Sequence, residues 1–170
     1  MDGGRIQKRT RLTTQDLEVV RLLRGQPSAV LESIAQKGVC RTYDKDERVI
    51  DAGRPPTAVF LLLSGQVRVQ LLGQGQRKIT YQLLNAGEMF GELACIDNGP
   101  RTADVTAETD AVVAQIPAGE FRRLLHEHAE FAQVILQRVV MLSRWLSEKV
   151  FEYHAYNLTG RICAELLRLS

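Results

Sequence analysis

The sequence Phe-Gly-Glu-Leu-Ala at 90–94, followed by Pro-Arg-Thr-Ala at 100–103, is the most informative part of the chain. Gly91 lacks a Cβ atom, so a ligand or a neighbouring backbone can approach it closely. Glu92 only accepts hydrogen bonds when ionised and suits a hydroxyl group, whereas Arg101 offers a planar fork of donors that matches two phosphate oxygens. These residues indicate a binding site for a small phosphate-bearing ligand. A Glu92–Arg101 ion pair that braces a loop would explain them equally well.

The residues after the glycine favour one turn of helix. Glu92, Leu93 and Ala94 are good helix formers, and the N-terminal N–H groups and dipole of a helix attract an anion. Thr102 adds a hydroxyl donor beside Arg101. The spacing therefore permits phosphate and sugar to be anchored together.

The composition indicates one domain of ordinary size, with room for an appended element. The chain has 170 residues, of which 45% are hydrophobic, and a net charge of +2, which argues against a nucleic-acid coat. Cys40, Cys95 and Cys163 are too far apart for a metal or redox motif, so we expect thiols in a reducing cytoplasm. We expect no signal peptide, because residues 1–11 carry charge but no apolar core, and no membrane span, because the longest apolar run, 59–63, is short.

The chain begins with a basic stretch, residues 1–12, which we expect to be a flexible arm. Thr13 or Thr14 can cap a helix that buries one apolar face, and a second helix should begin at 27–28 and stop at Gly38. The expected buried residues of the first helix are Leu17, Val20 and Leu23, and those of the second are Val30, Leu31 and Ile34.

Between residues 41 and 117 the pattern is that of short strands separated by Gly, Pro and Asn or Asp. The expected strands are 59–63, 66–71, 78–83, 103–107 and 111–116. The second and third should form a hairpin around 73–75. Such spacing, without alternating helices, predicts a mostly β fold with flanking helices: a sandwich, a barrel or a jelly roll.

Helical periodicity returns after Ala118, with a short helix at 119–125 and a long one from about 129 to 156. Along the long helix an apolar seam repeats in steps of three and four and predicts a parallel dimer. A neighbouring seam through Leu136, Ser143 and Val150 fits about as well, and so does a helix lying across its own domain. The seam residues are Val139, Leu142, Leu146 and Tyr153.

The last residues suggest that the protein continues. Asn157 and Thr159 resemble a helix break and a new cap, and 161–169 begins another amphipathic helix that stops at Ser170. We therefore expect a further domain beyond this chain. The expected division is 1–12, an arm; 13–128, a β domain; 129–157, a dimerisation helix; and 158–170, the start of another domain.

The quoted residues support a family resemblance over roughly 15–170. The segments 90–94 and 100–103, with the length between them, resemble the phosphate-binding cassette of cyclic-nucleotide-binding domains. The glycine rhythm of 63–67 and 84–91 is similar too. The segments around 147–150 and 158–162 resemble the linker of bacterial transcription regulators of the catabolite activator and fumarate-nitrate regulator superfamily.

This resemblance implies a β-roll, a jelly-roll variant, followed by a long dimer helix and a helix-turn-helix DNA-binding domain. It implies that Glu92 accepts from the ribose 2′-hydroxyl, while Arg101 and Thr102 hold the cyclic phosphate. Backbone N–H groups of 91–94 and of Ala103 would complete the cradle.

The resemblance is weaker around the base. The strand 78–82 would line the base, and Ser147 falls where the long helix of such regulators touches it. Leu146, however, stands where an adenine-binding member has a threonine from its partner chain, and Leu142 replaces a basic residue. Thr102 is also used by domains that select cyclic GMP, so cyclic AMP is favoured and cyclic GMP stays open.

The predicted function is therefore the sensing and dimerising part of a bacterial transcription regulator. A cyclic nucleotide would control DNA binding allosterically, with RNA polymerase as a further partner. The alternatives are an empty pocket, another ligand, or a regulatory domain of a different signalling protein. We expect neither enzyme activity nor a metal: residues 126–128 (His-Glu-His) resemble a cupin motif, but positions two apart on a helix diverge.

Overall fold

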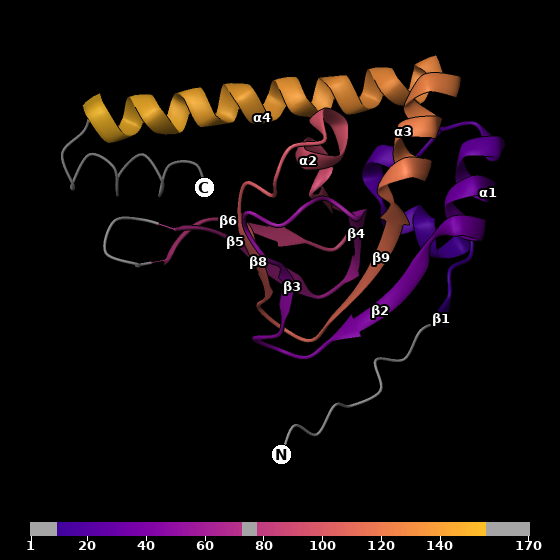
Figure 1. Ribbon diagram of the computed structural model, residues 1–170, viewed down its shortest axis with the longest axis horizontal. Coiled ribbons are helices and arrows are strands. Elements are labelled where there is room, and N and C mark those ends of the chain that lie inside the picture. Colours follow the sequence, from indigo (N-terminus) through magenta and orange to yellow (C-terminus); the bar gives the residue numbers. More distant parts are fainter. Residues whose placement is uncertain (1–9, 73–77, 156–170) are drawn as a thin grey trace. The chain divides into compact units, whose positions relative to one another are not determined.

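The computed structural model describes residues 10–72 and 78–155 (Figure 1). The chain divides into two compact units, residues 1–132 and 133–170. The expectations for the basic arm at 1–9, the turn at 73–77 and the helix at 161–169 lie outside the described residues.

The first unit is a β-roll of two antiparallel sheets, which confirms the predicted fold class (Figure 1). One sheet has the strand order β1-β2-β9-β4-β7 and the other the order β3-β8-β5-β6. Buried side chains of both sheets, such as Phe60 and Val113 from one and Val67 and Val105 from the other, form a shared core. The strands are β1 (Thr10–Arg11), β2 (Val39–Tyr43), β3 (Arg48–Ile50), β4 (Ala58–Ser64), β5 (Gln66–Leu72), β6 (Lys78–Asn85), β7 (Met89–Phe90), β8 (Asp104–Ala107) and β9 (Ala111–Pro117).

The expected hairpin is confirmed: β5 and β6 pair antiparallel, with Val69 opposite Gln82. Four strands have no counterpart among the expected ones, namely β1, β2, β3 and β7. Each has five residues or fewer, and each is held by pairing with distant sequence, as where Cys40 of β2 lies opposite Ala114 of β9. Local periodicity carries little information about such pairing.

The predicted first helix is wrong in type but right in what it buries. Two 3₁₀ helices, η1 (Gln15–Val19) and η2 (Arg21–Leu23), replace it, because Val20 between them adopts an extended backbone. Leu17, Val20 and Leu23 are all buried. The cap comes from the residue before Thr14: Thr13 and Asp16 exchange hydrogen bonds between side chain and backbone N–H in both directions.

Two α-helices of the first unit are bound to each other by a polar network. In α1 (Ser28–Lys37) Ser33 donates to Glu120 of α3 (Ala118–Glu127), and Arg123 donates to the same carboxylate at 2.6 Å. Val30 and Ile34 of α1 are buried as expected, whereas Leu31 is only half-buried. The network fixes the position of α3 against α1.

The Glu120 network should make stability depend on pH. The hydrogen bond from Arg123, followed by that from Ser33, lowers the pKa of Glu120, and burial opposes them only in part. A carboxylate whose folded-state pKa is lowered stabilises the fold above its unfolded pKa and loses that contribution as pH falls through the folded value. We therefore expect Glu120→Gln to lower the free energy of unfolding at pH 7, and the deficit to shrink below about pH 4.5.

Urea titrations between pH 3 and 7 measure this effect. Glu127→Gln is the matched control, because Glu127 also pairs with Arg123 but is 51% exposed, against 11% for Glu120. A deficit for Glu120→Gln that stays constant across the pH range would contradict the prediction.

The long helix α4 (Ala129–Ala155) matches the expected one to within a residue. Its first turn belongs to the first unit, where Phe131 packs edge-on against Phe121 of α3 at a centroid distance of 6.0 Å. Among the described residues, no helix combines the length and apolar character that a membrane span requires.

Candidate functional site

The site predicted from sequence is a continuous segment, residues 90–103, which we call the cassette. After β7 the chain turns at Gly91, whose φ is +76°, and enters α2 (Glu92–Asp97). Asn98, also left-handed, ends α2, and the N–H of Gly99 donates to the Asp97 carboxylate at 2.8 Å. The single turn of helix that the sequence suggested is thus six residues long and leads back to Arg101.

Arg101 lies inside the cassette and is only 6% exposed. Its Nη1 donates to the Gly91 carbonyl at 2.7 Å, and its Nη2 donates to the Ala58 carbonyl at 2.5 Å. The guanidinium also lies over the Phe60 ring, with Cζ 5.3 Å from the centroid, and Phe60 stacks on Phe90. The side chain is therefore fixed in direction by β4 and the turn at Gly91.

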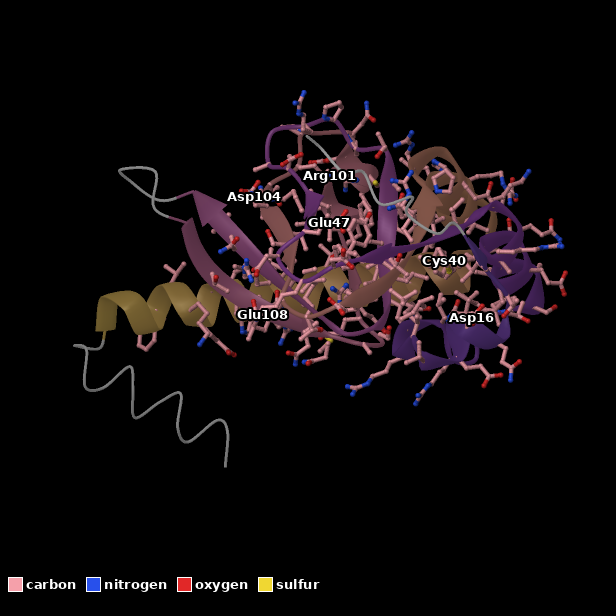
Figure 2. The ribbon with its side chains drawn as sticks, turned by 90° about the horizontal axis from the view of Figure 1, so that it is seen from below. Asp16, Cys40, Glu47, Arg101, Asp104 and Glu108 are labelled. Atoms are coloured by element: carbon pink, nitrogen blue, oxygen red, sulfur yellow. The ribbon has the colours of Figure 1, made fainter. Side chains whose placement is uncertain are left out.

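A loop from another part of the sequence holds the backbone of the same arginine. The N–H of Gly53 donates to the Arg101 carbonyl at 2.8 Å, and the N–H of Arg101 donates to the Arg54 carbonyl at 2.9 Å. Asp104 accepts from the N–H of Ala52 and forms an ion pair with Arg48 at 2.7 Å. Figure 2 shows Arg101 and Asp104 in this region, away from Asp16 and Cys40.

The structure brings the predicted cassette residues together with different degrees of burial. Glu92 is 3% exposed, Ala94 and Ala103 are buried, Gly91 and Leu93 are half-buried, and only Thr102 is exposed. Arg101 has five N–H donors and gives two of them to carbonyls and one to the Cys95 sulfur, so donors remain for an anion. An anionic oxygen is a stronger acceptor than a neutral carbonyl, and more so where water is largely excluded.

The other predicted residues lie on α4. Ser147 is exposed and its hydroxyl donates to the Ser143 carbonyl at 3.0 Å, within the second unit. Of the predicted seam, Leu146 is 42% exposed, Val139 and Leu142 are half-buried, and the Tyr153 side chain lies outside the description. Other apolar side chains of α4 are more exposed: Leu136, Met141, Val150 and Phe151.

The sequence analysis did not identify the buried residues that contact the Arg101 guanidinium. Ala58 supplies a carbonyl and Phe60 a ring. Cys95, which is 0% exposed, donates its Sγ–H to the same Ala58 carbonyl at 3.3 Å. Burial raises the pKa of the Cys95 thiol, and the nearby Arg101 opposes this in part. The sequence carries no local signal for these contacts, because they join residues up to 43 positions apart.

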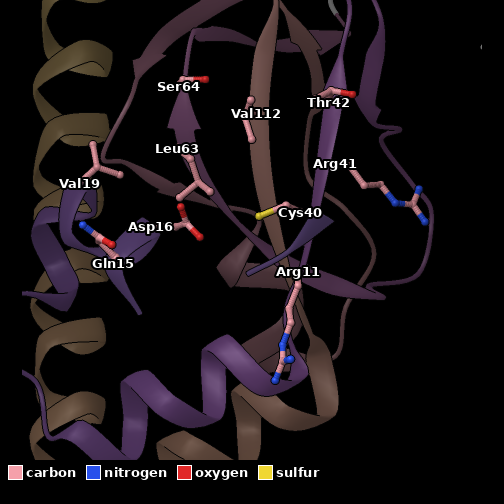
Figure 3. Close-up of a pocket in the computed structure, with 10 residues that line it drawn as sticks. All are labelled: Arg11, Gln15, Asp16, Val19, Cys40, Arg41, Thr42, Leu63, Ser64 and Val112. Atoms are coloured by element: carbon pink, nitrogen blue, oxygen red, sulfur yellow. The ribbon is translucent and has the colours of Figure 1, made fainter. Parts of the chain in front are cut away.

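A separate cavity of about 440 Å³ opens on the five-stranded sheet, away from the cassette (Figure 3). Asp16 points toward Cys40 in it, while the guanidinium groups of Arg11 and Arg41 point away. Its inward-facing charge is therefore negative, which does not suit a phosphate. The lining residues are Arg11, Gln15, Asp16, Val19, Cys40, Arg41, Thr42, Leu63, Ser64 and Val112.

The part of the chain that the structure describes contains no group of three His, Cys, Asp or Glu residues placed to hold a metal ion.

Residues 40–128, which contain the whole cassette, match the cyclic nucleotide-binding domain family. The chain belongs to this family. The match covers β2 to the end of α3 and thus includes the loop at 52–54 that holds Arg101.

The chain is also similar to parts of longer proteins. It is 27% identical over 129 residues to the cAMP-activated global transcriptional regulator CRP of Salmonella typhimurium, a match that covers 75% of this chain and 61% of the relative. It is 32% identical over 129 residues to Glutaminase 1 of Bradyrhizobium diazoefficiens, covering 76% of this chain but only 20% of the relative. The chain thus matches about three fifths of one relative's length and a fifth of the other's.

Solved structures share the fold. The catabolite activator protein of Thermus thermophilus superposes with a TM-score of 0.65 at 25% identity, covering 78% of this chain and 61% of the other. The sensor domain of the transcriptional regulator DNR from Pseudomonas aeruginosa superposes with a TM-score of 0.67 at 20% identity, covering 85% and 95%. The chain therefore has the β-roll fold of the cyclic nucleotide-binding domain family and is similar in sequence to part of the CRP regulator.

Proposed function

We propose that this chain is the sensing and dimerising part of a transcription regulator, and that its cassette binds a cyclic nucleotide, with cyclic AMP favoured. The observation that carries the proposal is the buried Arg101 at the centre of a cassette that lies within the family match. In this role the guanidinium pairs with the cyclic phosphate, Thr102 donates to it, and N–H groups of 91–94 and Ala103 complete the cradle. Glu92 accepts from the ribose 2′-hydroxyl.

The residues of this chain indicate the identity of the base less clearly than they indicate the phosphate and the ribose. We propose, from the family resemblance, that the strand at 78–82 lines the base. The same resemblance makes Ser147 the proposed polar contact of the base. Leu142 and Leu146 carry no polar group with which to distinguish adenine from guanine. Cyclic GMP therefore remains the alternative ligand. We propose no catalytic role for the cassette, and a cytoplasmic location.

Calorimetric titration of the chain with cyclic AMP and cyclic GMP tests this function. We expect exothermic binding of cyclic AMP, with a smaller affinity for cyclic GMP. Adenosine 5′-monophosphate is the control, because it carries the same base and sugar without the cyclic phosphate. Absence of heat with both cyclic nucleotides on the folded chain would favour the second candidate, a family member with an empty pocket or another ligand.

We also propose the domain division 1–12, 13–128, 129–157 and 158–170, with dimerisation through α4. DNA would be read by a further domain, with RNA polymerase as a partner. Ligand binding would act by favouring one arrangement of the paired helices, and it can do so only by its differential affinity for the two arrangements. Support for the dimer comes from the exposed apolar side chains on the two seams of α4, namely Leu136, Leu146 and Val150.

Replacing Leu146 with aspartate should dissociate the dimer, because it places a charge in the apolar seam. Sedimentation equilibrium measures the change. Met141→Asp is the matched control: Met141 is also apolar and is 70% exposed, but it faces well away from the seam on the helix. Dissociation by the Met141 variant alone would place the interface on a different face of α4.

A further inference from the structure

Cys95 joins the cassette to the helix that follows the β-roll. It lies in the last turn of α2, where backbone carbonyls have no partner within the helix. Its carbonyl accepts from Nη1 of Arg122, on α3, at 3.2 Å. A cation at this end also complements the helix dipole. The half-buried Arg122 therefore binds α2 to α3 at a defined atom.

The side chain of the same cysteine faces Arg101. Its Sγ–H donates to the Ala58 carbonyl, which also accepts from Arg101 Nη2, and Arg101 Nη1 lies 3.9 Å from the sulfur. Arg101 and Cys95 thus share one acceptor. If the guanidinium changes direction, its Nη1 bond to the Cys95 sulfur and its Nη2 bond to the shared Ala58 carbonyl change with it.

The path continues from Arg122 to α4. The preceding residue, Phe121, is fully buried and packs edge-on against Phe131 in the first turn of α4. By contrast, the next residue, Arg123, bonds to Glu120 and Glu127 of α3 and to Ser33 of α1. Of these two neighbouring arginines, Arg122 therefore contacts the cassette and Arg123 contacts α1.

We propose that Arg122 is a positioning residue that couples Arg101, through Cys95, to α3 and the start of α4. The role of this coupling rests on the proposed function, because the anion that would bind Arg101 is the cyclic phosphate. Contiguity alone does not establish coupling; a double-mutant cycle does.

Hydrogen exchange of the α3 amides in the full chain tests the coupling without any ligand. Arg101→Gln is introduced into the wild-type, Arg122→Met, Arg122→Lys and Arg123→Met backgrounds. We expect it to accelerate α3 exchange by about 2-fold to 30-fold in the wild-type and Arg123→Met proteins. In Arg122→Met it should leave α3 exchange unchanged, and Arg122→Lys should restore part of the response, since an ammonium can still donate to the Cys95 carbonyl.

Two results would overturn the proposal: an equal response in the wild-type and Arg122→Met proteins, or no response in the wild-type protein. If Arg101→Gln fails to fold, Cys95→Ala takes its place, because it removes the sulfur but keeps the carbonyl that Arg122 contacts. In a second experiment, saturating cyclic AMP is added. We expect it to change the hydrogen exchange of α3 in the wild-type protein but not in Arg122→Met, which should still bind the nucleotide. If the wild-type chain does not bind cyclic AMP, the proposed function is wrong. The ligand-free double-mutant cycle still tests the coupling in that case.

Discussion

Replacing Arg101 with alanine should abolish measurable binding of cyclic AMP. The guanidinium is the cassette's buried cation, and truncating one partner of a buried, hydrogen-bonded charge pair costs about 2–5 kcal/mol. That corresponds to a dissociation constant raised by about 30-fold to 5,000-fold. Calorimetry on the wild-type and variant chains measures the loss, and Arg24→Ala, which removes an exposed arginine distant in sequence, should bind as the wild type does.

The same variant should also be less stable, and this second effect can be separated from the first. Without Arg101 the carbonyls of Gly91 and Ala58 each lose a hydrogen bond from a charged donor, and such a bond contributes about 1.5–3 kcal/mol. Urea unfolding measures the loss. Arg101→Lys keeps a charge but not the fork, so it should fall between wild type and alanine in both assays. Wild-type affinity in a folded Arg101→Ala chain would mean that the phosphate is held elsewhere.

The parts of the fold that could be predicted from sequence are those encoded locally. The β5–β6 hairpin has alternating side chains on both strands, and α4 has a helical repeat over seven turns. The predicted type of the first helix was wrong because the apolar spacing of Leu17, Val20 and Leu23 fits both one α-helix and two 3₁₀ turns. The extended backbone of Val20, which decides between them, is set by packing rather than by propensity.

The candidate site was predictable in its residues but not in its geometry. The spacing of Glu92 and Arg101 identified the cassette, and the glycine at 91 does adopt the conformation that favours glycine. What could not be predicted is that Arg101 points inward to a carbonyl on β4 and that Cys95 shares that acceptor. Those contacts depend on how α2 packs against β4 and α3, which no local pattern in 90–103 specifies.

The contribution of Gly91 can be measured against a second glycine with the same backbone conformation. Gly91 and Gly53 have φ values of +76° and +77°, so alanine should strain either position by about 1–2 kcal/mol. Their surroundings differ. A Cβ at Gly53 would meet nothing within 4 Å, whereas at Gly91 it would lie 2.8 Å from Nη1 of Arg101 and 3.2 Å from Phe60.

Gly91→Ala should therefore destabilise the chain by about 1–3 kcal/mol more than Gly53→Ala, because overpacking a filled site adds to the backbone strain. It should also weaken cyclic AMP binding, since a Cβ at this position displaces the Nη1 that bonds to the Gly91 carbonyl. Gly53→Ala keeps the N–H that bonds to the Arg101 carbonyl and should bind nearly as the wild type does. Urea unfolding and calorimetry on both variants decide the matter: equal losses would mean that backbone conformation alone requires glycine at 91, and that Arg101 can yield to the added methyl group without cost.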